Sequence, residues 1–174
     1  MLLSHLLAFC RITIGLVFTI SFLGKVRNVD RFAQTITSFQ LLPRQLSKAA
    51  AILFLTGELV VVILLILGRG FLPIAFAAAF LLLLTFSVAL LSVVTRNIQT
   101  ACNCFGVKEE YVTYHDVWRN VGYTVCSLVG WRIWLLMEGS SGNQTLAELV
   151  LISPIAIVFV VVWTHLRHMT RLFQ

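Results

Sequence analysis

The sequence predicts an all-α integral membrane protein: an antiparallel bundle of four to five transmembrane helices, with an interfacial amphipathic helix after the first. Fifty-nine per cent of the 174 residues are hydrophobic and only 11% are charged, which leaves more apolar surface than a soluble domain can bury. Five apolar runs approach the roughly 20 residues that a helix needs to cross a bilayer. Lys and Arg residues flank these runs, as is usual at membrane boundaries. The net charge of +6 therefore indicates membrane flanks and excludes nucleic acid as the expected partner.

The apolar runs predict one transmembrane domain over residues 1–174, with spans at about 2–24, 49–67, 71–94, 115–137 and 146–166. We expect the first span to be retained, because no basic stretch precedes it. Connections this short make consecutive helices antiparallel. Pro154 predicts a kink or a break in the last span. These features are typical of a multi-pass protein of a bacterial inner membrane.

The segment after the first span has helical amphipathicity. Val29, Phe32, Ile36 and Phe39 recur every three or four residues, and Pro43 ends the pattern. The other faces carry charged and polar residues: Arg27, Asp30, Arg31 and Gln34. A helix lying on the membrane surface explains the stripe, and so does a helix packed over the ends of other helices.

The candidate chemical centre is a pair of cysteines between the third and fourth spans, in the sequence Cys102-Asn103-Cys104-Phe105-Gly106. A disulfide between thiols this close in the chain closes a small ring, and exposed, strained disulfides exchange readily. Thiolates also suit Cu(I) and Zn, although the neighbourhood lacks the four ligands of a structural zinc site. The spacing thus leaves redox chemistry, soft-metal binding and inert loop cysteines open. Cys10 and Cys126 are interpreted as small buried hydrophobic residues.

Charged residues near the same membrane level are further candidates. Lys25 ends the first span and Arg119 begins the fourth, and neighbouring cations lower the pKa of a thiol. Glu58 lies inside the second span, where a carboxylate is costly and is by default a functional candidate. It could handle protons, pair with a cation, or make a hydrogen bond that only fixes helix packing. Ordinary membrane-flanking cations are the alternative for Lys108 and Arg96.

Several of these residues occur together in a pattern that resembles the MauE family of methylamine-utilisation membrane proteins, which is related to the DoxX group. The pattern comprises Ser21 to Lys25, Phe32, Leu41-Leu42-Pro43, Glu58, the CxCFG element at 102–106, and Arg119-Asn120. The resemblance covers about residues 8–135. It implies a helical bundle that supports disulfide formation and maturation of exported partner proteins, such as the methylamine dehydrogenase small subunit.

The resemblance also implies roles for individual residues. Cys102 and Cys104 would exchange with a thioredoxin-like partner, so the implied enzyme activity is that of a thiol-disulfide oxidoreductase. A quinone held near Lys25, Arg119 and Asn120 would accept the electrons, and Glu58 would handle the protons. Two alternatives stay open: an assembly factor that binds its client without redox turnover, and a protein that handles a soft metal such as copper.

The side of the membrane on which the cysteine pair lies is predicted differently by two arguments. Ten of the thirteen Lys and Arg residues fall on the face that holds the pair, which places that face in the cytoplasm. Disulfide chemistry instead favours an oxidising compartment outside the cytoplasm.

Overall fold

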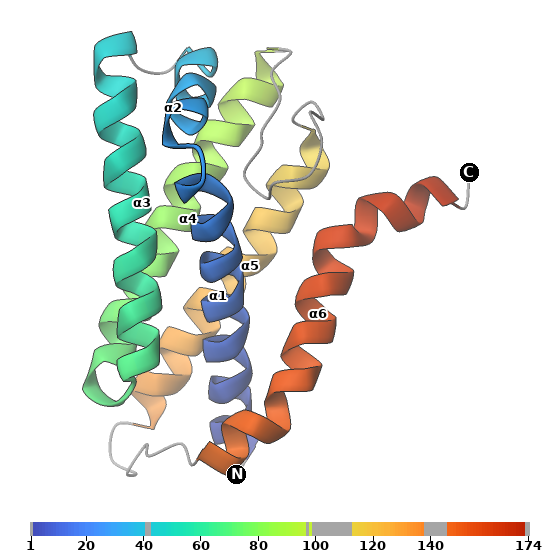
Figure 1. The fold of residues 1–174 in the computed structure, drawn as a ribbon. Helices are drawn as coiled ribbons and strands as arrows, with labels where there is room; N and C mark the ends of the chain where they lie inside the picture. Colours follow the sequence, from blue (N-terminus) through green and yellow to red (C-terminus); the bar gives the residue numbers. More distant parts are fainter. Residues whose placement is uncertain (1, 41–42, 97, 99–112, 138–145, 173–174) are drawn as a thin grey trace.

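A computed structural model describes residues 2–40, 43–96, 98, 113–137 and 146–172 (Figure 1). Its long helices alternate in direction, so that each is antiparallel to the long helix before it. The elements in chain order are α1 (Leu2–Val26), α2 (Val29–Ser38), α3 (Arg44–Leu67), the 3₁₀ turn η1 (Arg69–Phe71), α4 (Leu72–Thr95), α5 (Tyr114–Leu136) and α6 (Leu146–Leu172).

This architecture confirms the predicted fold class, an all-α multi-pass membrane protein. Within the described residues, four segments are long and apolar enough to cross a membrane: Leu2–Val26, Gln45–Leu67, Leu72–Thr95 and Ala147–Thr164. Helix α5 has 23 residues and packs extensively on α4, but its sequence is less apolar because it carries Asp116, Arg119 and Arg132. Its length of about 35 Å, at 1.5 Å per residue, matches that of its neighbours.

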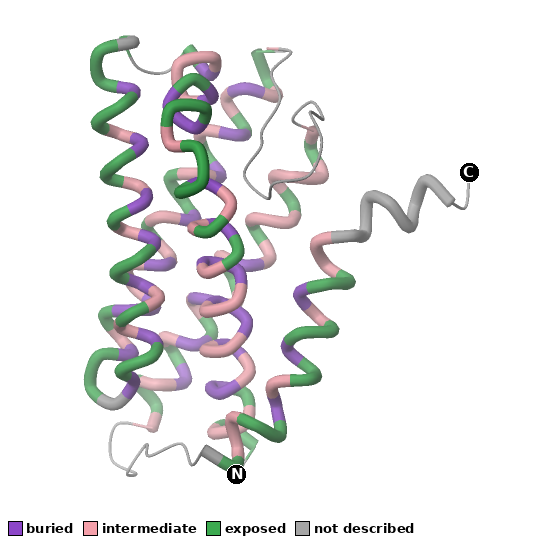
Figure 2. Tube along the Cα trace, in the orientation of Figure 1, coloured by how far each residue is buried: buried purple, intermediate pink, exposed green. Residues whose placement is uncertain are grey.

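The core lies where α1, α3, α4 and α5 meet. Figure 2 shows buried positions lining the inside of the bundle and exposed positions facing outward. Ile14, Val61, Phe76 and Tyr123 are among the fully enclosed side chains. Large apolar side chains cover the outward faces, for example Ile66 and Leu81. In water such a surface would be unstable, so it is the surface that contacts lipid.

Helix α2 packs its apolar face over the ends of its neighbours. Phe32 contacts the cluster formed with Ala51 and Leu55 of α3, and the Phe39 side chain that follows α2 packs against Leu90 of α4. The side chain of Asn28 caps the helix by accepting a hydrogen bond of 3.1 Å from the Arg31 backbone N–H. The predicted stripe therefore stabilises one end of the bundle, while its polar face stays exposed.

Helix α3 ends at a specific contact with α1. Gly68 has a φ of 63°, a conformation that only glycine adopts without strain. Arg11 donates from Nε to the Leu65 carbonyl at 2.8 Å and from Nη2 to the Ile66 carbonyl at 3.2 Å. These carbonyls lack helical partners, and a cation complements the negative end of the helix dipole. Arg11 thus satisfies the C-terminal end of α3.

Helices α4 and α5 approach each other closely at Gly130. A Cβ built on Gly130 would lie 2.6 Å from the Phe76 ring, which is completely buried. One turn earlier in α5, the Ser127 hydroxyl donates to the Phe76 carbonyl at 2.8 Å. The glycine and the short polar side chain together allow the two backbones to lie near each other.

Helix α6 packs mainly along α1 and diverges from the rest of the bundle (Figure 1). It continues through Pro154 without a break, although Figure 1 shows that it is not straight. The predicted interruption is therefore a bend at most. A link to α5 comes from Trp163, whose indole N–H donates to the Arg119 carbonyl at 3.2 Å.

Candidate functional site

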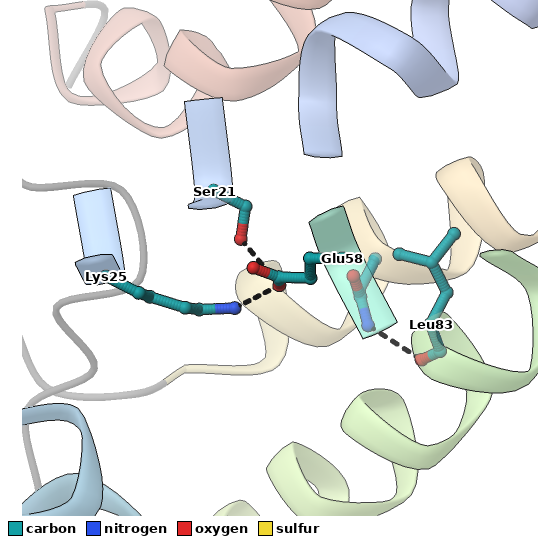
Figure 3. A network of polar contacts seen from close by, with 5 residues as sticks. Ser21, Lys25, Glu58 and Leu83 are labelled. Atoms are coloured by element: carbon teal, nitrogen blue, oxygen red, sulfur yellow. Dashed lines mark hydrogen bonds and ion pairs between the residues drawn. The ribbon is translucent and has the colours of Figure 1, made fainter. Parts of the chain in front are cut away.

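The candidate site is built around an ion pair between Lys25 of α1 and Glu58 of α3. The Lys25 ammonium donates to Glu58 Oε1, and the two side chains are only 4% and 7% exposed. The Ser21 hydroxyl donates to the same oxygen at 3.0 Å. Figure 3 shows the Ser21 and Lys25 side chains converging on the Glu58 carboxylate. Two α1 side chains therefore fix one oxygen of an acid that α3 carries inside the bundle.

Local sequence explains how these side chains meet. Ser21 and Lys25 are four residues apart, so they lie one turn apart on the same face of α1. The chain reverses through α2, which brings α3 alongside α1 in the opposite direction. A carboxylate in the body of α3 can then meet an ammonium near the end of α1.

Two aromatic rings enclose the ammonium. Lys25 Nζ lies 4.9 Å from the centroid of the Phe32 ring and 5.3 Å from that of Phe86. Both distances suit cation–π attraction, which strengthens when water is excluded. Helices α2 and α4 thereby supply the remaining walls around the charge. Such a pair is expensive to desolvate and persists only where its polar contacts are well made.

A small cavity adjoins the ion pair. Its volume is about 30 Å³, which is room for about two water molecules. Its wall includes Ser21, Lys25, Glu58 and Asn120, with apolar side chains from α1, α3 and α4. The second carboxylate oxygen, Glu58 Oε2, is buried and has no hydrogen-bond partner among the described residues. Because buried carboxylate oxygens are normally satisfied, this oxygen marks a place for a polar guest such as water.

Asn120 forms the polar wall opposite α1. Its amide nitrogen donates to the Leu83 carbonyl at 3.0 Å and to the Ser87 hydroxyl at 2.8 Å. Both acceptors belong to α4, so the amide group joins α5 to α4 beside the cavity. The structure thus brings together Lys25, Glu58 and Asn120 of the sequence-predicted residues, and adds Ser21.

Arg119 occupies a different place. It does not line the cavity, and its Nη2 lies 3.4 Å from Asp116 Oδ1, one turn earlier in α5. Asp116 also accepts hydrogen bonds from the backbone and hydroxyl of Thr113 and so caps the start of the helix. The arrangement holds Arg119 at the N-terminal end of α5, separate from the Lys25–Glu58 pair.

Cys102 and Cys104 lie outside the described residues, as does Lys108. In the sequence, the cysteine pair falls between the end of α4 at Thr95 and the start of α5 at Tyr114. Both of these helix ends lie at the end of the bundle where α1 finishes (Figure 1). Across the described ranges, His, Cys, Asp and Glu side chains form no group of three or more that could hold a metal ion.

Ser21 is the site residue for which the sequence alone predicted no role. The signal was present, because Ser21 stands four residues before Lys25 and both therefore share one face of a helix. A serine on a transmembrane helix, however, most often bonds to its own backbone. Only the position of α3 shows that this hydroxyl donates to the Glu58 carboxylate.

Comparisons with known proteins agree with the sequence pattern. Residues 3–135, which cover α1 to α5, match the model of the family described as methylamine utilisation protein MauE. The methylamine utilization protein MauE of Paracoccus denitrificans is 32% identical over 120 residues, covering 68% of this chain and 64% of that protein. No solved structure is significantly similar to the chain. On the extent of the family match, the chain belongs to the MauE family of membrane proteins.

Proposed function

We propose that this protein is a membrane thiol-disulfide redox protein of methylamine utilisation, in which Cys102 and Cys104 alternate between dithiol and disulfide. Its role would be to support disulfide formation in exported partner proteins. The observation that carries the proposal is the buried Lys25–Glu58 pair: Glu58 lines a cavity large enough for water, and its Oε2 has no hydrogen-bond partner in the described part of the chain. Charges are rarely kept within a bundle of apolar helices unless they serve a function.

The chemistry requires a group that handles protons. When a client dithiol reduces the Cys102–Cys104 disulfide, two electrons and two protons pass to the pair while a disulfide forms in the client. Reoxidation of the pair releases the same two electrons and two protons. Glu58 is suited to accept a proton in this second step, because Oε2 has no competing partner among the described residues and water can reach it through the cavity. Lys25 binds the other carboxylate oxygen, Oε1, and so fixes the position of the acid.

The proposed partners follow from the same chemistry. A thioredoxin-like protein would carry the disulfide to the client, by exchange with the cysteine pair. For the exported client we propose a protein of methylamine utilisation, because the relative in Paracoccus denitrificans is named for methylamine utilization. The methylamine dehydrogenase small subunit is the specific client that we propose to test.

As the final electron acceptor we propose a quinone, but not in the cavity beside Glu58. Room for about two waters is too little for a quinone ring, so the cavity suits proton transfer alone. The lack of room concerns the cavity at Lys25 and Asn120, and Arg119 lies outside that cavity, so a quinone near Arg119 stays part of the proposal. The check is to reduce the purified protein, add a quinone and count free thiols at Cys102 and Cys104. Thiols that stay free would remove the quinone from the proposal.

The decisive experiment is thiol labelling in intact cells, with Cys10 and Cys126 replaced by serine. A membrane-impermeant maleimide is applied before and after mild reduction, and the gel shift is read. We expect labelling only after reduction, which identifies a disulfide on the outer face and overrides the charge bias. Free thiols that react only after the inner membrane is opened would contradict the proposal and favour client assembly or metal handling.

A functional assay separates these alternatives. We expect Cys102→Ser/Cys104→Ser to abolish maturation of the client. Full maturation by that variant would show an assembly factor that needs no redox turnover. About one equivalent of copper retained by the purified wild-type protein, and lost in the same variant, would instead identify soft-metal handling.

A further inference from the structure

The side-chain amide of Asn120 has only one orientation that its contacts on α4 allow. A backbone carbonyl accepts hydrogen bonds and never donates, so the group 3.0 Å from the Leu83 carbonyl is the amide nitrogen of Asn120. The Ser87 hydroxyl donates its own hydrogen to the same carbonyl at 2.8 Å, and therefore accepts from that nitrogen. Both amide hydrogens are thus used on α4, and the oxygen Oδ1 is the part of the amide left for another partner.

Two acceptor oxygens, Asn120 Oδ1 and Glu58 Oε2, belong to side chains that line the same cavity. In the part of the chain that the structure describes, the hydrogen bonds of the Asn120 side chain are the two made by its nitrogen. Glu58 Oε2 is buried and likewise has no partner in the described ranges, while Oε1 is held by Lys25 and Ser21. Helices α5 and α3 therefore each bring an unsatisfied acceptor to the wall of one small space.

The chemistry of this wall selects the molecule that fits it. Two acceptors are satisfied by a guest with two donor hydrogens, and a cavity of about 30 Å³ limits that guest to the size of water. A metal cation is poorly suited, because the Lys25 ammonium already balances the Glu58 carboxylate. A neutral donor satisfies both oxygens without placing a further charge beside that ammonium.

We infer that a bound water bridges Glu58 Oε2 and Asn120 Oδ1, and that Asn120 is the positioning residue for this water. The water donates one hydrogen to each oxygen, so α5 fixes where it lies relative to the acid on α3. Its role rests on the proposed function: during reoxidation of the cysteine pair, the water passes one proton to Oε2. It takes one proton in return from the second water of the cavity, so the bridging water is itself unchanged.

The water site is tested by a crystal structure of the full chain, grown from a lipid phase, at a resolution that shows ordered water. We expect density for one water at about 2.5–3.2 Å from both Glu58 Oε2 and Asn120 Oδ1. Asn120→Ala should lose the water at that position, and Ser87→Ala should keep it. An empty cavity in the wild type, or the same water retained in Asn120→Ala, would overturn the inference. No cysteine takes part in this readout, so it is independent of the proposed function.

A rate measurement separates positioning of the water from the mechanical link between α5 and α4. Ser87→Ala is the matched control, because it removes one bond of the same amide while Ser87 does not line the cavity. Both variants should lower the melting temperature, since each loses a bond between the two helices.

Only Asn120→Ala should slow reoxidation of the Cys102–Cys104 pair, by about 10- to 100-fold, and move the pH midpoint of that rate. Equal rates and equal pH profiles in the two variants would overturn the positioning role. The thiol labelling in cells decides the proposed function separately, so its failure is distinguishable from the absence of the water.

Discussion

The guanidinium of Arg11 fills the space in which a side chain on Gly68 would begin. A Cβ built on Gly68 would lie 2.6 Å from Arg11 Nη2, and the backbone φ of 63° also disfavours any side chain. Gly68→Ala should therefore destabilise the protein by about 1–3 kcal/mol. Thermal unfolding in detergent, followed by circular dichroism, measures the change. Gly70→Ala is the control, because a Cβ there meets nothing within 4 Å, and equal melting temperatures for both variants would contradict the prediction.

Arg11 itself should contribute to stability through the end of α3. Arg11→Met keeps much of the apolar stem but removes the donors to the Leu65 and Ile66 carbonyls. We expect a loss of about 1.5–3 kcal/mol, the usual contribution of hydrogen bonds to a charged group. Titration with sodium dodecyl sulfate gives the free energy of unfolding. Arg11→Lys should lose less, since it keeps the charge at the helix end, and a lysine variant as unstable as the methionine variant would argue against the dipole contribution.

Removing one member of the Lys25–Glu58 pair should be far more harmful than removing both. Lys25→Met leaves the Glu58 carboxylate buried without its cation, and a cost of about 3–5 kcal/mol is typical of such a change. Lys25→Met/Glu58→Met should recover most of that loss, because no unpaired charge is left. The melting temperatures of the wild type, Lys25→Met, Glu58→Met and the double variant form a double-mutant cycle, whose coupling measures the pair. Additive losses would show that the two side chains do not depend on each other.

The double variant also separates structure from function. If Glu58 handles protons, Lys25→Met/Glu58→Met should fold well yet reoxidise its Cys102–Cys104 pair more slowly. Stopped-flow counting of free thiols measures this rate directly. A stable double variant that reoxidises at the wild-type rate would leave the ion pair a purely structural role.

The contact between α4 and α5 should tolerate no side chain at Gly130. A methyl group there would overlap the buried Phe76 ring at 2.6 Å, so Gly130→Ala should cost about 1–3 kcal/mol through overpacking. Gly15→Ala is the matched control, because its Cβ would lie 3.9 Å from its nearest neighbour and alanine favours a helix over glycine. Fluorescence-detected gel filtration after heating compares them. Greater loss of monomer for Gly15→Ala would reverse the expected order.

The fold class was predictable because it depends on composition and on local patterns. Apolar runs long enough to cross a bilayer predict helices, and short connections between them predict antiparallel neighbours. The stripe at Phe32 and Phe39 predicted an amphipathic helix, whose apolar face does pack over other helix ends. Whether Pro154 kinks or breaks the last helix could not be predicted from the sequence, since the effect of an internal proline depends on how neighbouring groups satisfy the freed carbonyl.

The contact partners of individual side chains were not predictable, because they depend on the axial position of one helix relative to another. Lys25 and Glu58 were each recognised as candidates, yet nothing in the chain shows that they share a level in the bundle. Arg11 at the end of α3 is another case. The roles of Cys102 and Cys104 stay predictions, because these residues lie outside the described part of the chain.

Dissolved ions weaken charge interactions in water, and at 0.1 M they do so over about 10 Å. The Lys48–Asp30 pair is open to this effect, because its side chains are 67% and 76% exposed. The Lys25–Glu58 pair lies behind aromatic rings, where counter-ions do not reach it. Raising the salt concentration should therefore weaken the attraction between Lys48 and Asp30 and leave that between Lys25 and Glu58 unchanged.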